Sequence, residues 1–144
     1  MAPLTQVTRH PEMSLKLIER DKEKHSWGMY SVSAGKSDYV IFIKSTSKIN
    51  RGKQNYSNFT FSTQDIGKLK KQTNDKILIC LVCHDEHICC IEKKEIDELK
   101  LLNSNKPCRI SVYWKKGSEL TVKSTFAELS QKVPRKRLKN YEWK

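Results

Sequence analysis

Apolar and polar residues alternate with a period of two over several segments of the chain, and this pattern predicts strands. The clearest strand is predicted by a different pattern: 76–83 does not alternate but is apolar at every position from Ile77 to Cys83, as in a strand buried on both faces of a sheet. Further strands are expected at 27–34, 39–48, 58–61, 88–91, 109–114 and 120–125. Neighbours separated by the short turns at 35–38, 84–87 and 115–118 are expected to form hairpins.

Helices are expected where the apolar spacing changes to three or four residues. The expected helices are 12–25, 63–73 and 93–102, and 126–132 fits a further short helical segment. In the first of these, Met13 and Leu17 mark a narrow apolar stripe. Ahead of the second, Ser62 and Asp65 have the spacing of a capping box, in which a hydroxyl and an acidic side chain cap the first turn reciprocally.

The expected order of elements is αβββαββαββ, which places the chain in the α+β class. We expect a mixed or antiparallel sheet of about six or seven strands packed against three helices. With 144 residues, the chain has the length of one domain. We expect this domain over 1–133, with 1–10 loosely ordered, followed by a basic tail over 134–144.

The charge adds a functional expectation to this fold. The chain has 28 Lys and Arg residues against 16 Asp and Glu residues, a net charge of +12. Such a surface attracts polyanions, and nucleic acid, DNA or RNA, is the commonest one.

There is no apolar run of membrane-spanning length and no apolar N-terminal segment, and the five cysteines are an odd number. We therefore expect a cytoplasmic protein with reduced thiols and no membrane partner.

Basic residues gather on several expected elements and in the tail, where they alternate with aromatic residues that can stack on unpaired bases. The candidates for nucleic-acid contact are Lys44, Lys48, Arg51, Lys53, Lys68, Lys70, Lys71, Lys115, Lys116, Arg135, Lys136, Arg137, Lys139 and Trp143. The orientation of the loops and helices decides which of them share a face. A gathering of these charges beside Tyr56, Tyr113 and Trp114 would indicate a binding groove.

The cysteines and histidines around 80–90 raise the question of a metal site. Successive strand residues point to opposite faces, so at most Cys83, His87 and Cys89 can converge at the end of the hairpin. No glycine stands between or just after the cysteines, as zinc knuckles usually require. The sequence favours buried structural thiols and no cofactor, and leaves open a metal site or a reactive thiol beside a histidine.

The order helix–strand–strand–strand–helix–strand, with Lys44 at the end of the apolar run 39–43, resembles the core of restriction-endonuclease-like nucleases. The resemblance implies a Mg²⁺-dependent nuclease in which Lys44 supports the attacking water and Asp38 or Glu19 supplies a carboxylate. Two positions before Lys44, where that family has an acid, stands Phe42, which cannot bind a metal. The resemblance therefore implies an inactive or binding-only relative more readily than an enzyme.

A second resemblance covers 55–136. It is carried by Phe59-Thr-Phe-Ser62, by Ile79-Cys-Leu-Val-Cys83, by the Ile-Cys-Cys-Ile run at 88–91 before an acidic helix, and by Val133-Pro-Arg135. These segments resemble a group of small uncharacterised bacterial proteins, which implies no particular activity. Three functions stay open: a nucleic-acid-binding protein that contacts mainly the phosphate backbone, a Mg²⁺-dependent nuclease or its inactive relative, and an interaction module or inhibitor for an acidic protein partner.

Overall fold

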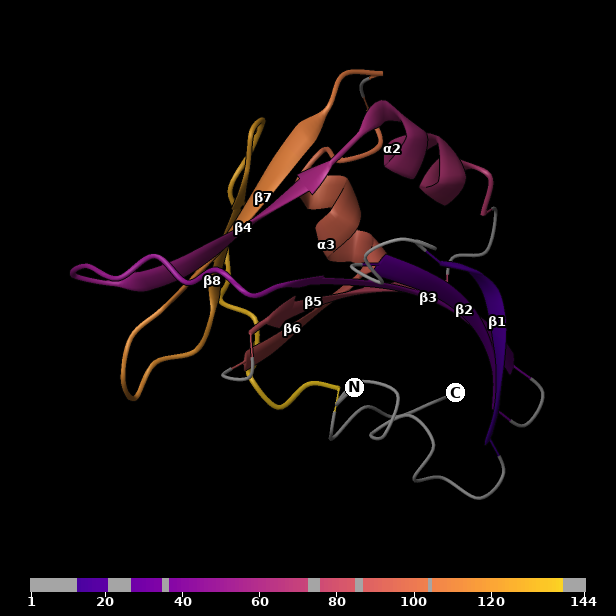
Figure 1. Cartoon of the computed structure of the whole chain (residues 1–144), viewed down its shortest axis with the longest axis horizontal. Coiled ribbons are helices and arrows are strands. Elements are labelled where there is room, and N and C mark those ends of the chain that lie inside the picture. The colour runs from indigo at the N-terminus through magenta and orange to yellow at the C-terminus, as the bar shows by residue number, and fades with distance from the viewer. Residues whose placement is uncertain are drawn as a thin grey trace.

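The computed structural model describes residues 13–20, 27–34, 37–72, 76–84, 87–103 and 105–138. The strands of this part are β1 (Met13–Arg20), β2 (Trp27–Ala34), β3 (Ser37–Thr46), β4 (Asn55–Phe61), β5 (Ile77–Cys83), β6 (His87–Glu92), β7 (Cys108–Trp114) and β8 (Thr121–Ser124). Its helices are α2 (Thr63–Lys70) and α3 (Lys93–Glu98). The fold is α+β, as predicted, and its strands form two sheets (Figure 1).

The larger sheet has five strands in the order β1-β2-β3-β5-β6. Strands β1, β2 and β3 form an antiparallel meander, β5 runs parallel to β3, and β6 returns antiparallel to β5. Between β3 and β5 the chain leaves this sheet to form β4 and α2. The predicted mixed pairing is therefore present, together with both predicted hairpins of this sheet.

Strand β5 is buried on both faces, as its continuous apolar run predicts. Its odd-numbered residues, among them Ile79 and Leu81, belong to the core cluster shared with the helices and the second sheet. Leu78 and Cys80 face a smaller cluster on the opposite side, which includes Leu138 from the C-terminal part of the chain. A strand with apolar partners on both sides does not need alternating polar residues.

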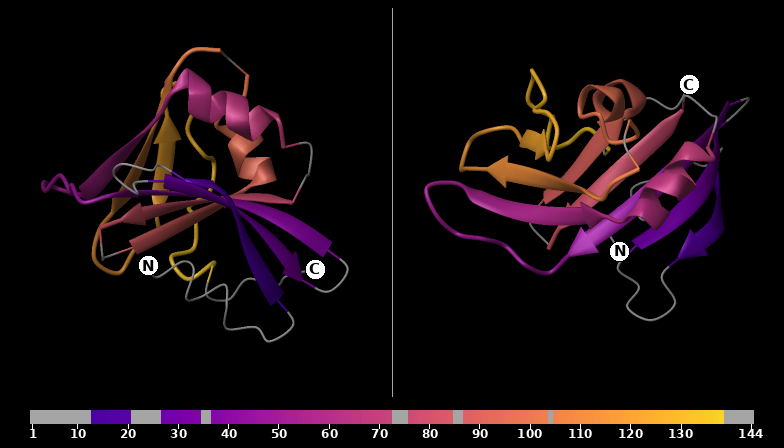
Figure 2. Two further views of the ribbon diagram at one scale, coloured as in Figure 1. Left: turned by 45° about the vertical axis from the view of Figure 1, so that its right-hand side comes forward. Right: turned by 90° about the horizontal axis from the view of Figure 1, so that it is seen from above.

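The smaller sheet has the order β4-β7-β8, and both of its pairings are antiparallel. Figure 1 and the left panel of Figure 2 show α2 and α3 in the wedge between the two sheets. Ile66 and Leu69 of α2 and Ile96 of α3 are buried there, together with Phe61 of β4. One core thus joins both helices to the inner face of each sheet.

The capping box predicted for the second helix is confirmed. The Ser62 hydroxyl accepts a hydrogen bond from the Asp65 backbone N–H at 3.1 Å, and Asp65 Oδ2 accepts one from the Ser62 N–H at 3.0 Å. Both predicted helices in this part of the chain are shorter than expected, because they end at Lys70 and Glu98.

The helix predicted over 12–25 is wrong where the structure describes it. Met13–Arg20 is strand β1, which pairs with β2. Met13, Leu15 and Leu17 also alternate with polar residues, so the apolar positions fit a period of two as well as a helical stripe. Strand β2 lies alongside this segment and supplies the backbone hydrogen-bonding partners of a strand, so Met13–Arg20 forms β1.

Two further expectations are corrected. One sheet was expected, but β4 pairs with β7, about fifty residues later, and starts a second sheet. The segment 126–132 is not a helix. It runs back along β8 through single bridges between Lys123 and Glu128 and between Leu120 and Val133. The Ser124 hydroxyl accepts hydrogen bonds from the backbone N–H groups of Phe126 and Ala127 and so holds this turn in place.

Neither helix in the described part of the chain has the length and apolar character that crossing a membrane requires.

Candidate nucleic-acid interface

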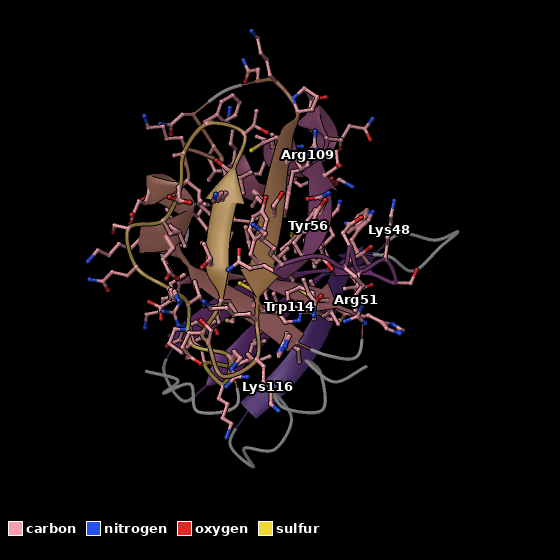
Figure 3. The ribbon with its side chains drawn as sticks, turned by 90° about the vertical axis from the view of Figure 1, so that its left-hand side faces the viewer. Lys48, Arg51, Tyr56, Arg109, Trp114 and Lys116 are labelled. Atoms are coloured by element: carbon pink, nitrogen blue, oxygen red, sulfur yellow. The ribbon has the colours of Figure 1, made fainter. Side chains whose placement is uncertain are left out.

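The outer face of the three-stranded sheet is an open, polar surface. Alternate residues of β4 and β7 point to opposite sides, and the inner ones, such as Phe59 and Ile110, are buried. The outer positions form cross-strand rows: Tyr56–Tyr113–Thr121, Asn58–Ser111–Lys123 and Thr60–Arg109. These residues are partly or fully exposed, and α2 and α3 lie on the other side of the sheet. Figure 3 views the molecule from this side.

Two tyrosines stack at the centre of this face. The ring centroids of Tyr56 and Tyr113 are 5.2 Å apart, and the ring planes differ by 28°. On the far side of Tyr113, the Nζ of Lys123 lies 5.2 Å from the ring centroid. The same ammonium group forms an exposed ion pair with Glu128, at 3.2 Å. The strand order therefore arranges one cation and two rings in a short column across the sheet.

Next to this column is a polar row. The Ser111 hydroxyl donates a hydrogen bond to Asn58 Oδ1, at 2.6 Å. This bond uses the acceptor end of the Asn58 amide and leaves its N–H donors for other partners. The row therefore offers a side-chain amide at a fixed place beside Tyr56.

Exposed cations surround one end of the sheet. The bridge between Asn50 and Tyr56 holds the loop that carries Arg51 and Lys53 at the start of β4. Asn55 pairs with Trp114, so the turn with Lys115 and Lys116 lies at the same end. Figure 3 shows Lys48, Arg51 and Lys116 around this end and Arg109 toward the other.

We call this surface the basic face. It consists of the outer residues Tyr56, Asn58, Thr60, Arg109, Ser111, Tyr113, Thr121 and Lys123 and the rim residues Lys48, Arg51, Lys53, Lys115 and Lys116.

The segments that build most of the basic face contain no acidic residue. Neither 45–64, which includes β4, nor 99–118, which includes β7, has an Asp or a Glu. The charges that these two segments bring to the surface are therefore all positive, while Glu128 offsets the charge of Lys123 on β8. Pairing β4 with β7 brings together two acid-free stretches, and the absence of Asp and Glu from both is visible in the sequence.

The basic residues of α2 lie elsewhere. Lys68 Nζ is 4.3 Å from the ring centroid of Trp27, and Lys70 Nζ donates a hydrogen bond to Asn105 at 2.9 Å. Lys71, the residue after the helix, is exposed. Trp27 lies on β2, and Asn105 precedes β7 at the end opposite Trp114, so Lys68 and Lys70 do not lie with Arg51 and Lys116.

The Lys44 side chain is mostly buried and forms an ion pair inside the protein. Its Nζ forms an ion pair with Asp65 Oδ2 at 2.9 Å, and the two side chains are only 15% and 10% exposed. The ammonium group also lies 5.2 Å from the Phe61 ring centroid. Asp65 is held in turn by the Ser62 N–H, so Lys44 is tied to the first turn of α2 and is not placed to contact phosphate.

Two members of the catalytic grouping that the nuclease resemblance implies, Asp38 and Lys44, are not brought together. Asp38 lies on the same strand as Lys44 but six residues away, which is about 20 Å along a strand. Its Oδ1 accepts a hydrogen bond from the Ser33 hydroxyl, at 2.9 Å. Glu19 lies on β1, and its side chain is outside the described part of the structure. Asp38 and Lys44 therefore cannot act on one metal or one substrate.

The beginning of the predicted tail packs against the domain. Arg137 donates a hydrogen bond from Nη1 to the Cys90 carbonyl at 3.0 Å and is paired with Glu95, and Leu138 is buried. Burial alone would lower the pKa of Arg137, but the hydrogen bond and the charge of Glu95 outweigh it and raise the pKa. Arg137 is therefore a structural cation, not an exposed phosphate contact.

The neighbours of Arg137 differ from it. Arg135 forms an exposed ion pair with Glu119, with Nε and Oε1 3.2 Å apart, and Lys136 is exposed. Lys139 and Trp143 lie outside the described residues.

The cysteine cluster is packed into the core. Cys83 pairs in register with His87, and Cys89 pairs with Leu81, so these three residues do share one end of the β5–β6 hairpin. Both thiols are buried, and burial, together with the neighbouring Cys83, raises the pKa of Cys89. The His87 ring packs edge-on against Trp114, with centroids 5.1 Å apart, and Trp114 is itself buried. Within the described residues, no three His, Cys, Asp or Glu side chains are grouped closely enough to hold a metal ion.

Comparison with known proteins adds no relative: no protein-family model matches the chain, and no curated protein or solved structure is significantly similar to it.

Proposed function

We propose that this protein binds nucleic acid through the basic face and that most of the binding free energy comes from contacts with phosphate groups. The observation that carries the proposal is the pairing of β4 with β7. It joins two acid-free segments into one exposed sheet surface with cations at both ends and stacked tyrosines between them.

The dimensions of the face suit a nucleic-acid strand. Strand β7 has seven residues, which extend over about 23 Å. At roughly 3.4 Å per stacked nucleotide, this length corresponds to six or seven phosphates of one strand. Each phosphate that a Lys or Arg neutralises releases condensed counterions, so the affinity should fall steeply as the salt concentration rises. Contacts of this kind position the strand but do not read its sequence.

The test is fluorescence anisotropy with labelled single-stranded and duplex oligonucleotides, between about 50 and 200 mM salt. The variant Arg51→Gln/Lys53→Gln/Lys116→Gln removes three charges from the basic face. The control Lys71→Gln/Lys94→Gln/Lys100→Gln removes three exposed charges that lie outside it. Both variants have the same net charge, so a general loss of attraction affects them equally.

The proposal predicts binding by the wild type at about 150 mM salt and a slope of log affinity against log salt that is shallower by about two in the face variant. The control variant should keep a slope close to that of the wild type. Equal slopes for the two variants, or no binding to any probe at this salt concentration, would overturn the proposal.

A further inference from the structure

We propose, on the basis of the proposed function, that the ring of Tyr56 stacks on an unpaired base, so that the basic face selects single-stranded nucleic acid over duplex. The two tyrosines form a column whose outer ring, Tyr56, has no further ring of the described residues beside it across the sheet, where the polar residue Asn50 bridges to it.

The column runs across the three strands in their spatial order. Lys123 of β8 lies against one side of the Tyr113 ring, and Tyr56 of β4 lies against the other. Both sides of Tyr113 are therefore occupied. Tyr56 is the last ring of the column, on the edge strand β4, and within the described residues Tyr113 is its one aromatic or cationic ring contact. A base that stacks on the partly exposed Tyr56 ring, next to Asn50, extends the column by one flat ring.

The surroundings of Tyr56 fit a nucleotide. The backbone of Asn50 bonds that of Tyr56 in both directions, at 2.9 and 2.8 Å, which fixes the loop with Arg51 and Lys53 beside the tyrosine. A base stacked on the ring would have its phosphates next to these two cations. On the other side, the Asn58 amide, held by Ser111, can donate to a carbonyl or ring nitrogen of the base.

A duplex cannot use this arrangement. Its bases are paired and stacked on one another, so their faces are not available to a protein ring. Duplex DNA can reach the cations of the rim but not the tyrosine column, and its affinity should depend on charge alone. Charge thus accounts for binding in general, and Tyr56 accounts for the preference between strand forms.

The test compares three probes: a labelled oligothymidylate of about 12 nucleotides, the same strand with abasic sites in place of its bases, and a duplex of equal length. Two variants separate the ring from the hydroxyl. Tyr56→Phe keeps the stacking surface, and Tyr56→Leu removes it while keeping an apolar side chain at a partly buried strand position. Thermal unfolding of both variants checks that the fold is retained.

We expect the wild type to bind oligothymidylate more tightly than duplex or abasic strand. Tyr56→Leu should lose between about 5-fold and 100-fold of its affinity for oligothymidylate and none for the duplex. Tyr56→Phe should bind like the wild type. The abasic strand should bind the wild type and Tyr56→Leu equally, because neither complex then contains the stack.

Equal losses for all three probes in Tyr56→Leu, or no loss for any of them, would overturn the stacking role of Tyr56. If the charge variant of the basic face still weakens all probes in that case, the proposed function stands without this inference. If no probe binds the wild type at about 150 mM salt, the proposed function and this inference fail together.

Discussion

The two sheets of this protein use their cationic side chains in opposite ways. Lys44 stands on β3, in a sheet packed on both faces, and is enclosed with Asp65. Arg109 stands on β7, in a sheet packed on one face, and is exposed on the other. Both residues are basic and both lie on strands, so residue type and local pattern do not distinguish them.

The difference follows from the cost of burying charge. A cation between two packed layers loses its hydration and persists only with a charged, hydrogen-bonded partner. A cation on an open sheet face keeps its hydration and remains available to a ligand. Lys44 is thus part of what holds α2 to the sheet, and Arg109 contributes little to stability. This contrast separates enclosed from exposed charge in a chain with 28 basic residues.

The largest effect is expected on breaking the buried pair. Asp65→Asn leaves the Lys44 ammonium group with no counter-charge in a site where its side chain is only 15% exposed. We expect a loss of about 3 kcal/mol in the free energy of unfolding, measured by urea denaturation.

The matched control for this change is Asp97→Asn, which breaks the exposed Lys93–Asp97 pair on α3 and should cost less than about 0.5 kcal/mol. Similar costs for the two substitutions would show that Lys44 is not buried as described. Nucleic-acid affinity of the folded Asp65→Asn protein should equal that of the wild type.

A smaller loss of stability is expected at the docked C-terminal segment. Arg137→Gln removes the pairing with Glu95 and the hydrogen bond to the Cys90 carbonyl, and should cost about 2 kcal/mol. Lys136→Gln, one residue earlier and exposed, should stay within about 0.5 kcal/mol of the wild type. Chemical denaturation measures both. If Arg137→Gln weakens nucleic-acid binding at unchanged stability, Arg137 is a ligand contact and not a structural cation.

The opposite behaviour is expected on the open face. Arg109→Gln should change the free energy of unfolding by no more than about 0.5 kcal/mol. In the anisotropy titration it should make the salt slope shallower by roughly 0.7 to 0.9, which corresponds to one phosphate contact. Lys71→Gln provides the comparison and should leave the slope unchanged. A destabilised Arg109→Gln protein with the wild-type salt slope would show that Arg109 stabilises the fold and does not contact phosphate.

The smallest effect concerns pH. The Ser130 backbone N–H donates a hydrogen bond to Glu98 at 2.6 Å and lowers the pKa of this exposed carboxyl. Because the pKa is lower in the folded protein, the bond stabilises the fold above the unfolded value of about 4.3, and its contribution disappears as the pH falls through the folded value. Any stability difference between the wild type and Glu98→Gln should therefore narrow below about pH 4 in thermal unfolding curves. A difference that stays constant down to about pH 3 would contradict this.

The parts of the fold that sequence could predict are those with a local signal. The capping box at Ser62 and Asp65 and the apolar run of β5 each specify their own structure within a few residues. The helix prediction for 12–25 was wrong because Met13, Leu15 and Leu17 fit both a strand period and a helical stripe. The choice between the two depends on pairing with β2, which is a separate strand. The second sheet depends on the register between β4 and β7, two strands far apart in the sequence.

The candidate site shows the same limit. Tyr56 and Tyr113 were named as possible neighbours of the basic clusters, and the structure brings them together, whereas Trp114 of the same group is buried. The partner of Lys44 lies 21 residues away on a helix, so its pairing has no local signal. The acid-free segments 45–64 and 99–118 were visible in the sequence, but only the pairing of their strands makes them one surface.

The most direct test of the central claim is an NMR titration of the ¹⁵N-labelled protein with a single-stranded oligothymidylate at about 150 mM salt. The account predicts that amide chemical shifts change mainly in β4, β7 and β8 and in the loops that carry Arg51 and Lys116. The amides of β3, β5 and α2 should stay nearly unchanged. Shift changes centred on α2 or on 134–138, or none at saturating oligonucleotide, would contradict the claim that the basic face is the nucleic-acid interface.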